Sequence, residues 1–257
     1  ALKKIAKHRK LAGDKSPWWW FVFTWPKEMH GKLTSFIAGT YKFSQMQTYF
    51  LPDETITVWN YVDKLFIRAL LRTITPVFKH IISPTCLHLG GPSGVQKTLD
   101  LATKAFGSER YRYFIRADIA GYYSSIDRSI LLGQVQQHFN DPRILDYLEQ
   151  VITIPVIENG AVLNPKLGVA LRSSLSPFFG ALYLSPLDAE FAHAPGVAYF
   201  RYMDDILILA QTKKQFSRAK KRLQNTLARL KLKLAKSKTK MGELTSGLHF
   251  LGINCEI

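Results

Sequence analysis

Cysteine, acidic side chains and long apolar runs are all scarce in this sequence. Its 257 residues include two cysteines, Cys86 and Cys255, which lie far apart and belong to no CxxC pair. Neither has a histidine beside it at a spacing typical of zinc ligands. We therefore expect both to be ordinary reduced thiols, and we expect no zinc site built on cysteine.

The densest apolar stretch runs from Trp18 to Trp25 and ends in a Trp-Pro step. It is far shorter than the roughly 20 residues that a bilayer span requires. The basic first residues are followed at once by Gly13 and Asp14, where a signal peptide would carry its apolar core. The sequence therefore predicts a cytoplasmic protein with no membrane span.

Acidic residues are outnumbered, since 19 Asp and Glu face 35 Lys and Arg and give a net charge of +16. Such an excess favours a polyanionic partner, with an anionic membrane surface as the competing possibility. Apolar residues make up 47% of the chain and aromatic residues 12%. These fractions are typical of a globular protein, so we expect one compact unit with sub-domains.

Two segments concentrate the positive charge. The opening ALKKIAKHRKLA predicts a short helix with one basic face, which either faces solvent or lies along a phosphate backbone. From Lys213 to Leu234 apolar residues recur at steps of three and four, which predicts an amphipathic helix. Between Lys213 and Lys240 there are twelve Lys or Arg and no acid. This pattern favours nucleic-acid contact over mere solubility, with these candidates: Lys220, Lys221, Arg222 and Arg229.

Three other segments predict elements of the core. The aromatic residues of Trp18 to Trp25 could stack on bases, although core packing is the favoured use. Apolar periodicity from Thr57 to Phe78 predicts a helix that ends or kinks at Pro76. The run PFFGALYLSPLD predicts a helix that opens at the Ser176-Pro177 step.

Three aspartates stand at the ends of predicted strands. The run YRYFIRADI, residues 111–119, predicts a strand that delivers Asp118. The run AYFRYMDDILILA predicts a hairpin, with arms at 198–202 and 206–209 joined through Met203, Asp204 and Asp205. Two adjacent acids between such apolar arms are costly unless a positive charge neutralises them, although a lone Asp-Asp pair is also an ordinary turn.

Asp118 favours a site neutralised by a cation over an ordinary turn, because three acids at strand ends could converge on one edge of a sheet. Mg²⁺ prefers hard oxygen ligands and is usually held by one or two carboxylates together with substrate phosphates. Two such ions, about 3.5 to 4 Å apart, clamp the attacking and leaving oxygens of a phosphoryl transfer. Three acids without a cysteine or histidine cluster fit that design.

Five short motifs resemble those of reverse transcriptases, and they occur in the order of that family. RADIAGYYSSID resembles motif A, LRSSLSPFFGALYLSPLD motif B, YMDD motif C, KSKTKMG motif D and GLHFLG motif E. Together they cover residues 111–257. The upstream aromatic and helical segments are similar to the fingers of bacterial enzymes of the group II intron and retron kind.

The resemblance implies roles for individual residues. Asp118 and Asp204 would bind two magnesium ions, Asp205 would complete the cluster, and the carbonyl of Ile119 would add a ligand. Tyr123 would lie under the sugar of the incoming nucleotide, and the alternative is that it is a core aromatic. Lys238 is a candidate proton donor to the leaving pyrophosphate or a simple surface lysine. The remaining assignments are Arg172 and Ser176 at the nucleotide, and Phe250, Leu251 and Gly252 as the primer grip.

One departure from the family lies in motif B. The usual Pro-Gln-Gly step is replaced by Ala170, Leu171 and Arg172. Leu171 cannot make the usual glutamine contact to nucleotide or template, and Arg172 could supply a charged contact to phosphate instead.

The sequence therefore predicts an α+β protein with the right-hand polymerase fold. Residues 1–110 would form the N-terminal region and helical fingers. Residues 111–257 would form the palm with its catalytic β-hairpin, with part of the fingers inserted near 128–170 and the helical thumb absent from this chain or supplied by another segment.

The predicted activity is RNA-directed DNA synthesis, which extends a primer with deoxynucleoside triphosphates by means of two Mg²⁺ ions, or Mn²⁺ in their place. The alternatives are a weakly templated or primer-independent nucleotidyl transferase and a non-catalytic RNA-binding module of a ribonucleoprotein. Expected partners are an RNA template, a DNA or RNA primer, a structured non-coding RNA and an accessory or thumb protein. Intron mobility, retron-like synthesis, diversity generation and phage defence are all compatible biological roles.

Overall fold

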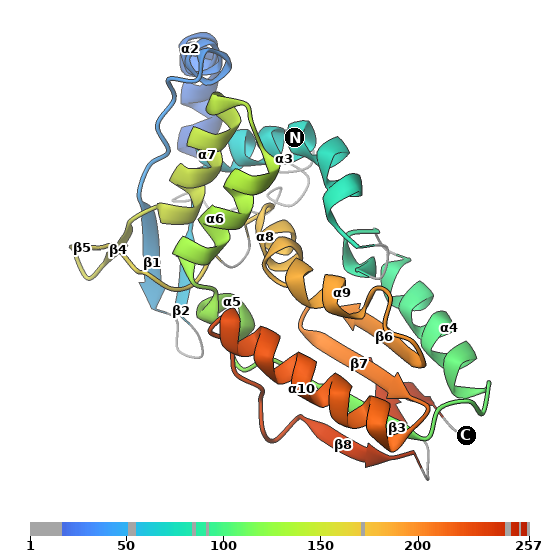
Figure 1. The fold of residues 1–257 in the computed structure, drawn as a ribbon. Coiled ribbons are helices and arrows are strands. Elements are labelled where there is room, and N and C mark those ends of the chain that lie inside the picture. The colour runs from blue at the N-terminus through green and yellow to red at the C-terminus, as the bar shows by residue number, and fades with distance from the viewer. Residues whose placement is uncertain are drawn as a thin grey trace.

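The computed structural model describes residues 17–50, 55–83, 86–90, 93–170, 173–244, 248–251 and 253–255. Figure 1 shows two regions, one built around a sheet with α10 across it and the other built mainly from helices beside a second sheet. The mixture of segregated sheets and helices confirms the predicted α+β class. In the described part of the chain, no helix is both long and apolar enough to cross a membrane.

A four-stranded sheet carries the catalytic hairpin predicted from the sequence. Its strand order is β6-β7-β3-β8, and all of its neighbouring strands are antiparallel. Their bounds are β3 Tyr113–Ala117, β6 Val197–Tyr202, β7 Asp205–Ala210 and β8 Lys240–Glu243. The predicted strand at 111–119 and the predicted hairpin are therefore confirmed, with bounds that differ by one or two residues.

Both faces of this sheet are buried, because alternate residues of β7 enter two different apolar clusters. Ile206 and Ile208 pack in the larger cluster, which includes Leu223 of helix α10 (Lys213–Arg229). Leu207 and Leu209 pack in the smaller one, on helix α4 (Gly94–Phe106). The predicted hairpin is therefore packed between helices, with α10 on one face and α4 on the other (Figure 1).

The basic amphipathic helix is shorter than predicted. α10 ends at Arg229, and Lys231 has a left-handed backbone with φ of 55°. The amides of Lys231 and Leu232 bond back to the carbonyls of Ala228 and Leu227, which is a Schellman closure. The prediction that the helix reaches Leu234 was wrong, because Leu234 pairs with Ile119 as an isolated β-bridge instead.

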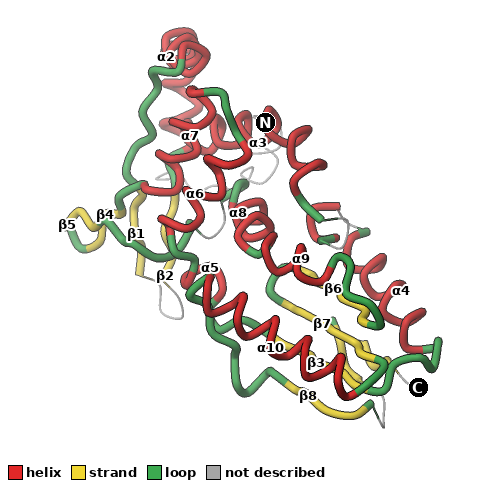
Figure 2. The backbone as a smooth tube through the Cα atoms, viewed as in Figure 1, coloured by secondary structure: helices red, strands yellow, loops and turns green. Residues whose placement is uncertain are grey.

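The second sheet joins segments far apart in sequence in the order β2-β1-β4-β5. β1 pairs antiparallel with β2 and parallel with β4, so residues after 150 lie against residues before 50. Figure 2 shows this sheet beside the group of helices at one end of the molecule. The bounds here are β1 Met46–Phe50, β2 Thr55–Val58, β4 Val156–Glu158, β5 Ala161–Leu163, α5 Tyr122–Ser125, α6 Arg128–His138 and α7 Pro142–Thr153. The sub-domain boundaries at 1–110, 111–257 and 128–170 stay a prediction.

The predicted helix at 57–78 is displaced. Thr57 and Val58 belong to strand β2, and helix α3 spans Tyr61–Ile81 with Asn60 as its N-cap. The helix does not end at Pro76, which lies inside it. The predicted apolar face is confirmed, since its central residues are all buried: Val62, Leu65, Phe66, Leu70 and Ile74.

The aromatic segment forms the first part of helix α2, Pro17–Ala38. Trp18 and Phe21 are buried in the core, as the favoured interpretation predicted. Trp20 and Phe23 are 61% and 72% exposed, so core packing does not account for them. The basic segment before this helix lies outside the described residues.

The predicted helix at 177–188 is two helices, α8 Ser176–Tyr183 and α9 Ser185–Phe191. Pro186 lies in the first turn of α9, where its missing N–H leaves no unmet bond. A continuous helix would need that N–H, which explains the break at Leu184. The start of α8 at the Ser176-Pro177 step is confirmed. The remaining elements are the 3₁₀ helix η1 at Leu87–Gly90, and β9 Leu248–Phe250 with β10 Ile253–Cys255.

The buried carboxylate of Asp63 ties α3 to the chain before β1. It is fully buried and accepts hydrogen bonds from the Tyr41 hydroxyl at 2.6 Å, the Ser44 amide at 3.0 Å and Asn60 Nδ2 at 2.8 Å. We expect Asp63→Ala to lower the free energy of unfolding by about 2 to 4 kcal/mol, because it leaves these donors without an acceptor.

Urea unfolding would measure this loss, with Asp146→Ala as the matched control. Asp146 pairs with Lys42 at 3.3 Å and accepts a hydrogen bond from Gln150 Nε2 at 2.6 Å, but its carboxylate is 43% exposed, so water can replace it and its removal should cost about 1 kcal/mol. Equal losses in the two variants would contradict the role given to Asp63.

Candidate active site

Three aspartates lie at one end of the main sheet. Asp118 directly follows β3, Asp204 lies in the turn after β6, and Asp205 is the first residue of β7. The register pairs Ala117 with Ile206, so Asp118 comes opposite Asp205 one step further along. The convergence predicted for the three acids is therefore present in the backbone.

Their charges act on one another. Burial is the main cause that raises the pKa of Asp204 and of Asp205 above its usual range. The charge of Asp118 adds to the rise of both pKa values, and Asp204 adds to that of Asp205. Ionised carboxylates in this position are thus unfavourable unless a cation lies close by.

The side chain of Lys238 forms an ion pair with one of these carboxylates. Its Nζ lies 3.0 Å from Oδ2 of Asp118, and this contact raises the pKa of the lysine. Lys238 is 68% exposed, whereas the Asp118 side chain is 13% exposed. The lysine therefore approaches the carboxylates from the solvent side.

The donor set matches a hard divalent cation in its chemistry, because it consists of carboxylate oxygens whose repulsion a cation would relieve. In the part of the chain that the structure describes, no three His, Cys, Asp or Glu side chains are already arranged to hold a metal ion. Asp118 faces Lys238 instead. Metal binding would need this lysine to move aside.

The backbone around Asp118 leaves one carbonyl available. The bridge between Ile119 and Leu234 is made by two bonds, from the Ala235 amide to the Asp118 carbonyl and from the Ala120 amide to the Lys233 carbonyl. Neither bond uses the carbonyl of Ile119. The ligand role predicted for it is thus compatible with the local pairing.

Tyr123 lies half-buried in the short helix α5, against α8. A Cβ added at Gly180 would approach the rings of Tyr122 and Tyr123 to 3.2 Å and the Tyr123 hydroxyl to 3.3 Å, so a larger residue there would displace these rings by a few tenths of an ångström. Burial raises the pKa of Tyr123 to about 12, and the charge of Asp204 contributes to the rise. The ring is therefore close enough to Asp204 for the charge of that carboxylate to affect its pKa.

The motif B residues are only partly described. Ser176 is buried at the start of α8, and its hydroxyl donates to the carbonyl of Ala170. This bond serves the helix start, and the predicted contact of Ser176 with a nucleotide stays a prediction. Leu171 and Arg172, which replace the usual residues of the family, lie outside the described residues.

The three residues of the predicted primer grip differ in their surroundings, and two of them are described. Phe250 is completely buried in the smaller cluster, against α4 and the sheet. Leu251 occupies the turn between β9 and β10 with a left-handed φ of 48°. Gly252 lies outside the described residues. Phe250 thus has a packing role in the structure, and primer contact by this turn stays a prediction.

Sequence reasoning missed a buried ion pair next to the turn that carries Asp204. Arg201 and Asp188 have side chains that are 0% and 1% exposed, with Nη2 and Nε of the arginine 2.5 and 2.7 Å from the carboxylate oxygens. The Tyr199 hydroxyl donates to the same carboxylate at 2.7 Å. A signal existed, because Tyr199 and Arg201 share one face of β6 and an inward arginine requires a partner.

A cavity of about 650 Å³ lies beside the β1–β2 hairpin. Aromatic side chains, amides and two lysines from α2, β1 and the start of α3 line it, among them Trp20, Gln47, Trp59, Tyr61 and Lys64. Among the residues that the structure describes, none of those lining it is acidic. Aromatic faces and positive charge in one cavity are typical of sites for unpaired bases.

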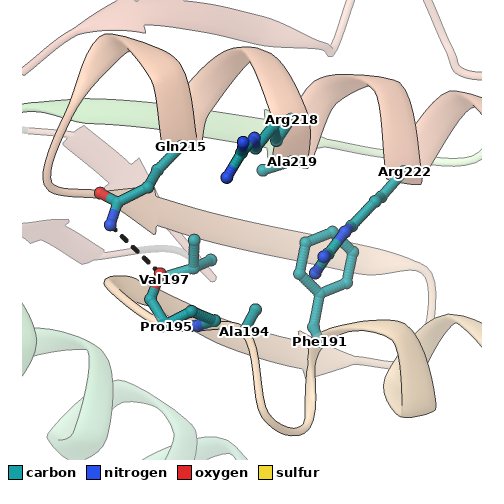
Figure 3. Close-up of a pocket in the computed structure, with 8 residues that line it drawn as sticks. All are labelled: Phe191, Ala194, Pro195, Val197, Gln215, Arg218, Ala219 and Arg222. Carbon is teal, nitrogen blue, oxygen red and sulfur yellow. Dashed lines mark hydrogen bonds between the residues drawn. The ribbon is translucent and has the colours of Figure 1, made fainter.

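The four basic residues predicted to contact nucleic acid all lie exposed on α10. Two of them already have contacts, since Arg229 pairs with Glu190 at 2.8 Å and Arg222 donates to the carbonyl of Glu190 at 3.3 Å. Figure 3 shows Arg218 and Arg222 pointing from α10 toward the loop that precedes β6, where Gln215 donates to the Pro195 carbonyl. Two of the four basic side chains are therefore held against α9.

Comparison with known proteins gives one family. A family model described as "Reverse transcriptase (RNA-dependent DNA polymerase)" matches residues 55–255. Protein YkfC of Escherichia coli (strain K12) is 24% identical over 228 residues, which cover 74% of this chain and 60% of YkfC.

Solved structures agree in their fold. A truncated apo telomerase from Candida Tropicalis matches with a TM-score of 0.63 at 14% identity, over 90% of this chain and 58% of that one. Telomerase from Candida albicans, solved with the TWJ fragment of telomeric RNA, matches with a TM-score of 0.63 at 12% identity, over 91% and 48%. The chain spans less than two thirds of the length of each of these relatives.

Proposed function

This chain belongs to the reverse transcriptase family and has its polymerase fold, and on that premise we propose that it is an RNA-directed DNA polymerase. The observation that carries the proposal is the meeting of three aspartates at one end of the palm sheet, where burial and the charge of Asp118 raise the pKa values of Asp204 and Asp205. The reaction would be attack of a primer 3′-hydroxyl on the α-phosphate of a deoxynucleoside triphosphate.

Asp118, Asp204 and Asp205 would hold two Mg²⁺ ions, or Mn²⁺, with the carbonyl of Ile119 as a further ligand. Such ions, when bound, polarise the phosphoryl group and neutralise the charge that develops on it. The protein itself supplies position and electrostatics rather than a covalent intermediate. Raised carboxylate pKa values support this assignment, because they mark groups that gain from a nearby cation.

Two other side chains would act on the nucleotide. Tyr123 would lie beneath its sugar, a role supported by the electrostatic coupling of the ring to Asp204. Lys238 would donate a proton to the leaving pyrophosphate, since it reaches the carboxylates from the solvent side. Its salt bridge with Asp118 gives it a second role, which is to neutralise that carboxylate before metal and nucleotide bind.

An RNA template is the proposed polyanionic partner. The net charge of +16 and the cavity beside β1 and β2 support it, and a related telomerase was solved with an RNA fragment. A structured non-coding RNA, and an accessory or thumb protein, remain proposed partners.

Primer extension tests the activity directly. Purified protein is given an RNA template, a DNA template or no template, each with and without a primer, in the presence of Mg²⁺. The proposal requires extension that depends on both RNA template and primer. Synthesis without them would favour a nucleotidyl transferase, and RNA binding without synthesis would favour the non-catalytic module.

The basic face of α10 is proposed to bind nucleic-acid phosphates. Replacing Lys220, Lys221, Arg222 and Arg229 with glutamine should weaken binding to an RNA duplex or hybrid and flatten its dependence on salt. Each phosphate contact that is lost should reduce the slope of log K against log salt by roughly one. Binding titrations at several salt concentrations measure both effects.

A matched control removes two lysines and two arginines elsewhere on the described surface: Lys27, Arg72, Lys104 and Arg110. This control should change the slope less than the α10 variant does. Equal slopes in the two quadruple variants would show that α10 contributes only to the general charge of the protein.

A further inference from the structure

The turn that carries Asp204 has an unfavourable backbone. Met203 is the first of two residues between Tyr202 and Asp205, which pair with each other, and its φ is 55°. A left-handed conformation at a residue other than glycine is costly, and such residues persist where their surroundings enforce them. Side-chain contacts that fix the backbone of Met203 would therefore stabilise this turn.

Two buried side chains do so from opposite sides. The amide of Met203 donates to Nδ1 of His88 at 3.3 Å, and the carbonyl of Met203 accepts from Nη1 of Arg201 at 3.0 Å. Both peptide groups that flank Met203 are thereby fixed. The second of them leads directly to Asp204.

The hydrogen bonds also define the state of His88. Its Nε2 lies 3.1 Å from the carbonyl of Pro177, which can only accept, so Nε2 carries the proton. Nδ1 is then free to accept from Met203. Burial lowers the pKa of His88, which agrees with a neutral ring. Cys86 Sγ lies 3.3 Å from the same Nδ1, and burial raises its pKa to about 11, so it stays a thiol.

His88 thus links three segments: η1, the start of α8 and the catalytic turn. Arg201 adds a fourth, because the same guanidinium pairs with Asp188 of α9. Among the contacts of the described residues, neither His88 nor Arg201 touches the carboxylate of Asp118, Asp204 or Asp205. Their action on Asp204 would pass entirely through the backbone of Met203.

We propose that His88 and Arg201 are positioning residues that clamp Met203 and so aim Asp204 at the reacting groups. The effect of this clamp on catalysis rests on the proposed function, whereas the contacts of His88 and Arg201 with Met203 do not. A turn released from the clamp would lose alignment, and a displacement of about 1 Å near reacting atoms costs up to roughly 100-fold in rate.

Two amide substitutions of His88 separate the clamp from general packing. His88→Asn places Oδ1 where Nδ1 was, so it can still accept from Met203, but it loses the bond to Pro177. His88→Gln places Nε2 where the ring Nε2 was, so it keeps the bond to Pro177 and loses Met203. Each variant keeps one of the two bonds, so their losses of stability should be similar.

The test measures hydrogen exchange of the Met203 amide by NMR, together with kcat and KM for primer extension. We expect His88→Gln to speed that exchange at least tenfold and to lower kcat about 10- to 100-fold with little change in KM. His88→Asn should stay within a few-fold of wild type in both measurements. Arg201→Lys should resemble His88→Gln if it folds, because lysine lacks the fork that reaches Asp188 and Met203 together.

The clamp is overturned if the two His88 variants change Met203 exchange equally, or if neither changes it. The positioning role is overturned if kcat simply follows the melting temperature across the variants. The two proposals can fail separately. If Met203 exchange is faster in His88→Gln than in His88→Asn but the wild-type protein synthesises no DNA, the proposed function is refuted and the clamp still holds.

Discussion

Asp204→Asn should fold normally and lose nearly all magnesium-dependent DNA synthesis. Asparagine keeps the shape of the side chain and removes the charge that a metal requires. Metal ions contribute several kcal/mol to stabilising the transition state of phosphoryl transfer. Since each 1.4 kcal/mol is about tenfold in rate, we expect kcat to fall roughly 1,000-fold or more.

The measurement is steady-state extension of a primer on an RNA template, with circular dichroism and thermal unfolding as the check on folding. Folding should survive, because burial and the charge of Asp118 already disfavour the ionised form of Asp204. The variant should even gain slight stability at neutral pH. The pKa of Asp204 is raised in the folded protein. Its ionisation therefore lowers the free energy of unfolding once the pH rises above the pKa that an aspartate has in the unfolded chain.

Asp100→Asn is the matched control. Asp100 is exposed on α4, outside the group of three aspartates, and accepts a hydrogen bond from Gln96 at 2.9 Å. It should keep wild-type activity. Near-normal synthesis by Asp204→Asn would refute the assignment of the three aspartates.

Local patterns were sufficient to predict the site's framework. The alternation in residues 111–119 and in the two arms of the hairpin defined strands whose ends carry Asp118, Asp204 and Asp205, and the register confirms that these ends coincide. The strands are buried on both faces, so any shift of register would move whole rows of apolar side chains.

Errors arose where partners distant in sequence decide the structure. Val58 and Val62 are four residues apart, which fits a helix face, yet Val58 pairs with Gln47 in a sheet. Leu234 continues the heptad-like spacing of α10, yet it pairs with Ile119. In both cases a β partner more than ten residues away overrides local periodicity.

The residues behind the site show the same limit of local pattern. His88 lies 115 positions from Met203, so no spacing rule connects them. The partner of Arg201 was easier to predict in kind, because an arginine on the inward face of β6 requires a buried acid. Only the fold identifies that acid as Asp188, which lies on helix α9.

Tyr123 should control the choice of sugar. Its ring is held against α8 at Gly180, so it has little room to move away from a bound nucleotide. If the sugar lies above this ring, a 2′-hydroxyl would clash with it, which is selection by exclusion rather than by added attraction. Tyr123→Ala and Tyr123→Val should therefore accept ribonucleotides far more readily, while use of deoxynucleotides falls less steeply.

The quantity to measure is kcat/KM for a deoxynucleotide divided by kcat/KM for the matching ribonucleotide, on one RNA template and primer. We expect this ratio to fall roughly 10- to 200-fold, the range over which the fit of one group in a pocket discriminates. Some general loss of activity should accompany it, because the half-buried ring also packs.

Tyr123→Phe distinguishes the ring from its hydroxyl. Phenylalanine keeps the bulk that would clash and removes only the polar atom, whose pKa of about 12 in the folded protein leaves it protonated at neutral pH. This variant should retain wild-type selectivity. If the ratio falls in Tyr123→Phe as far as in Tyr123→Ala, hydrogen bonding rather than bulk selects the sugar. If it changes in none of the variants while they remain folded and active, Tyr123 is a packing residue and the sugar is selected elsewhere.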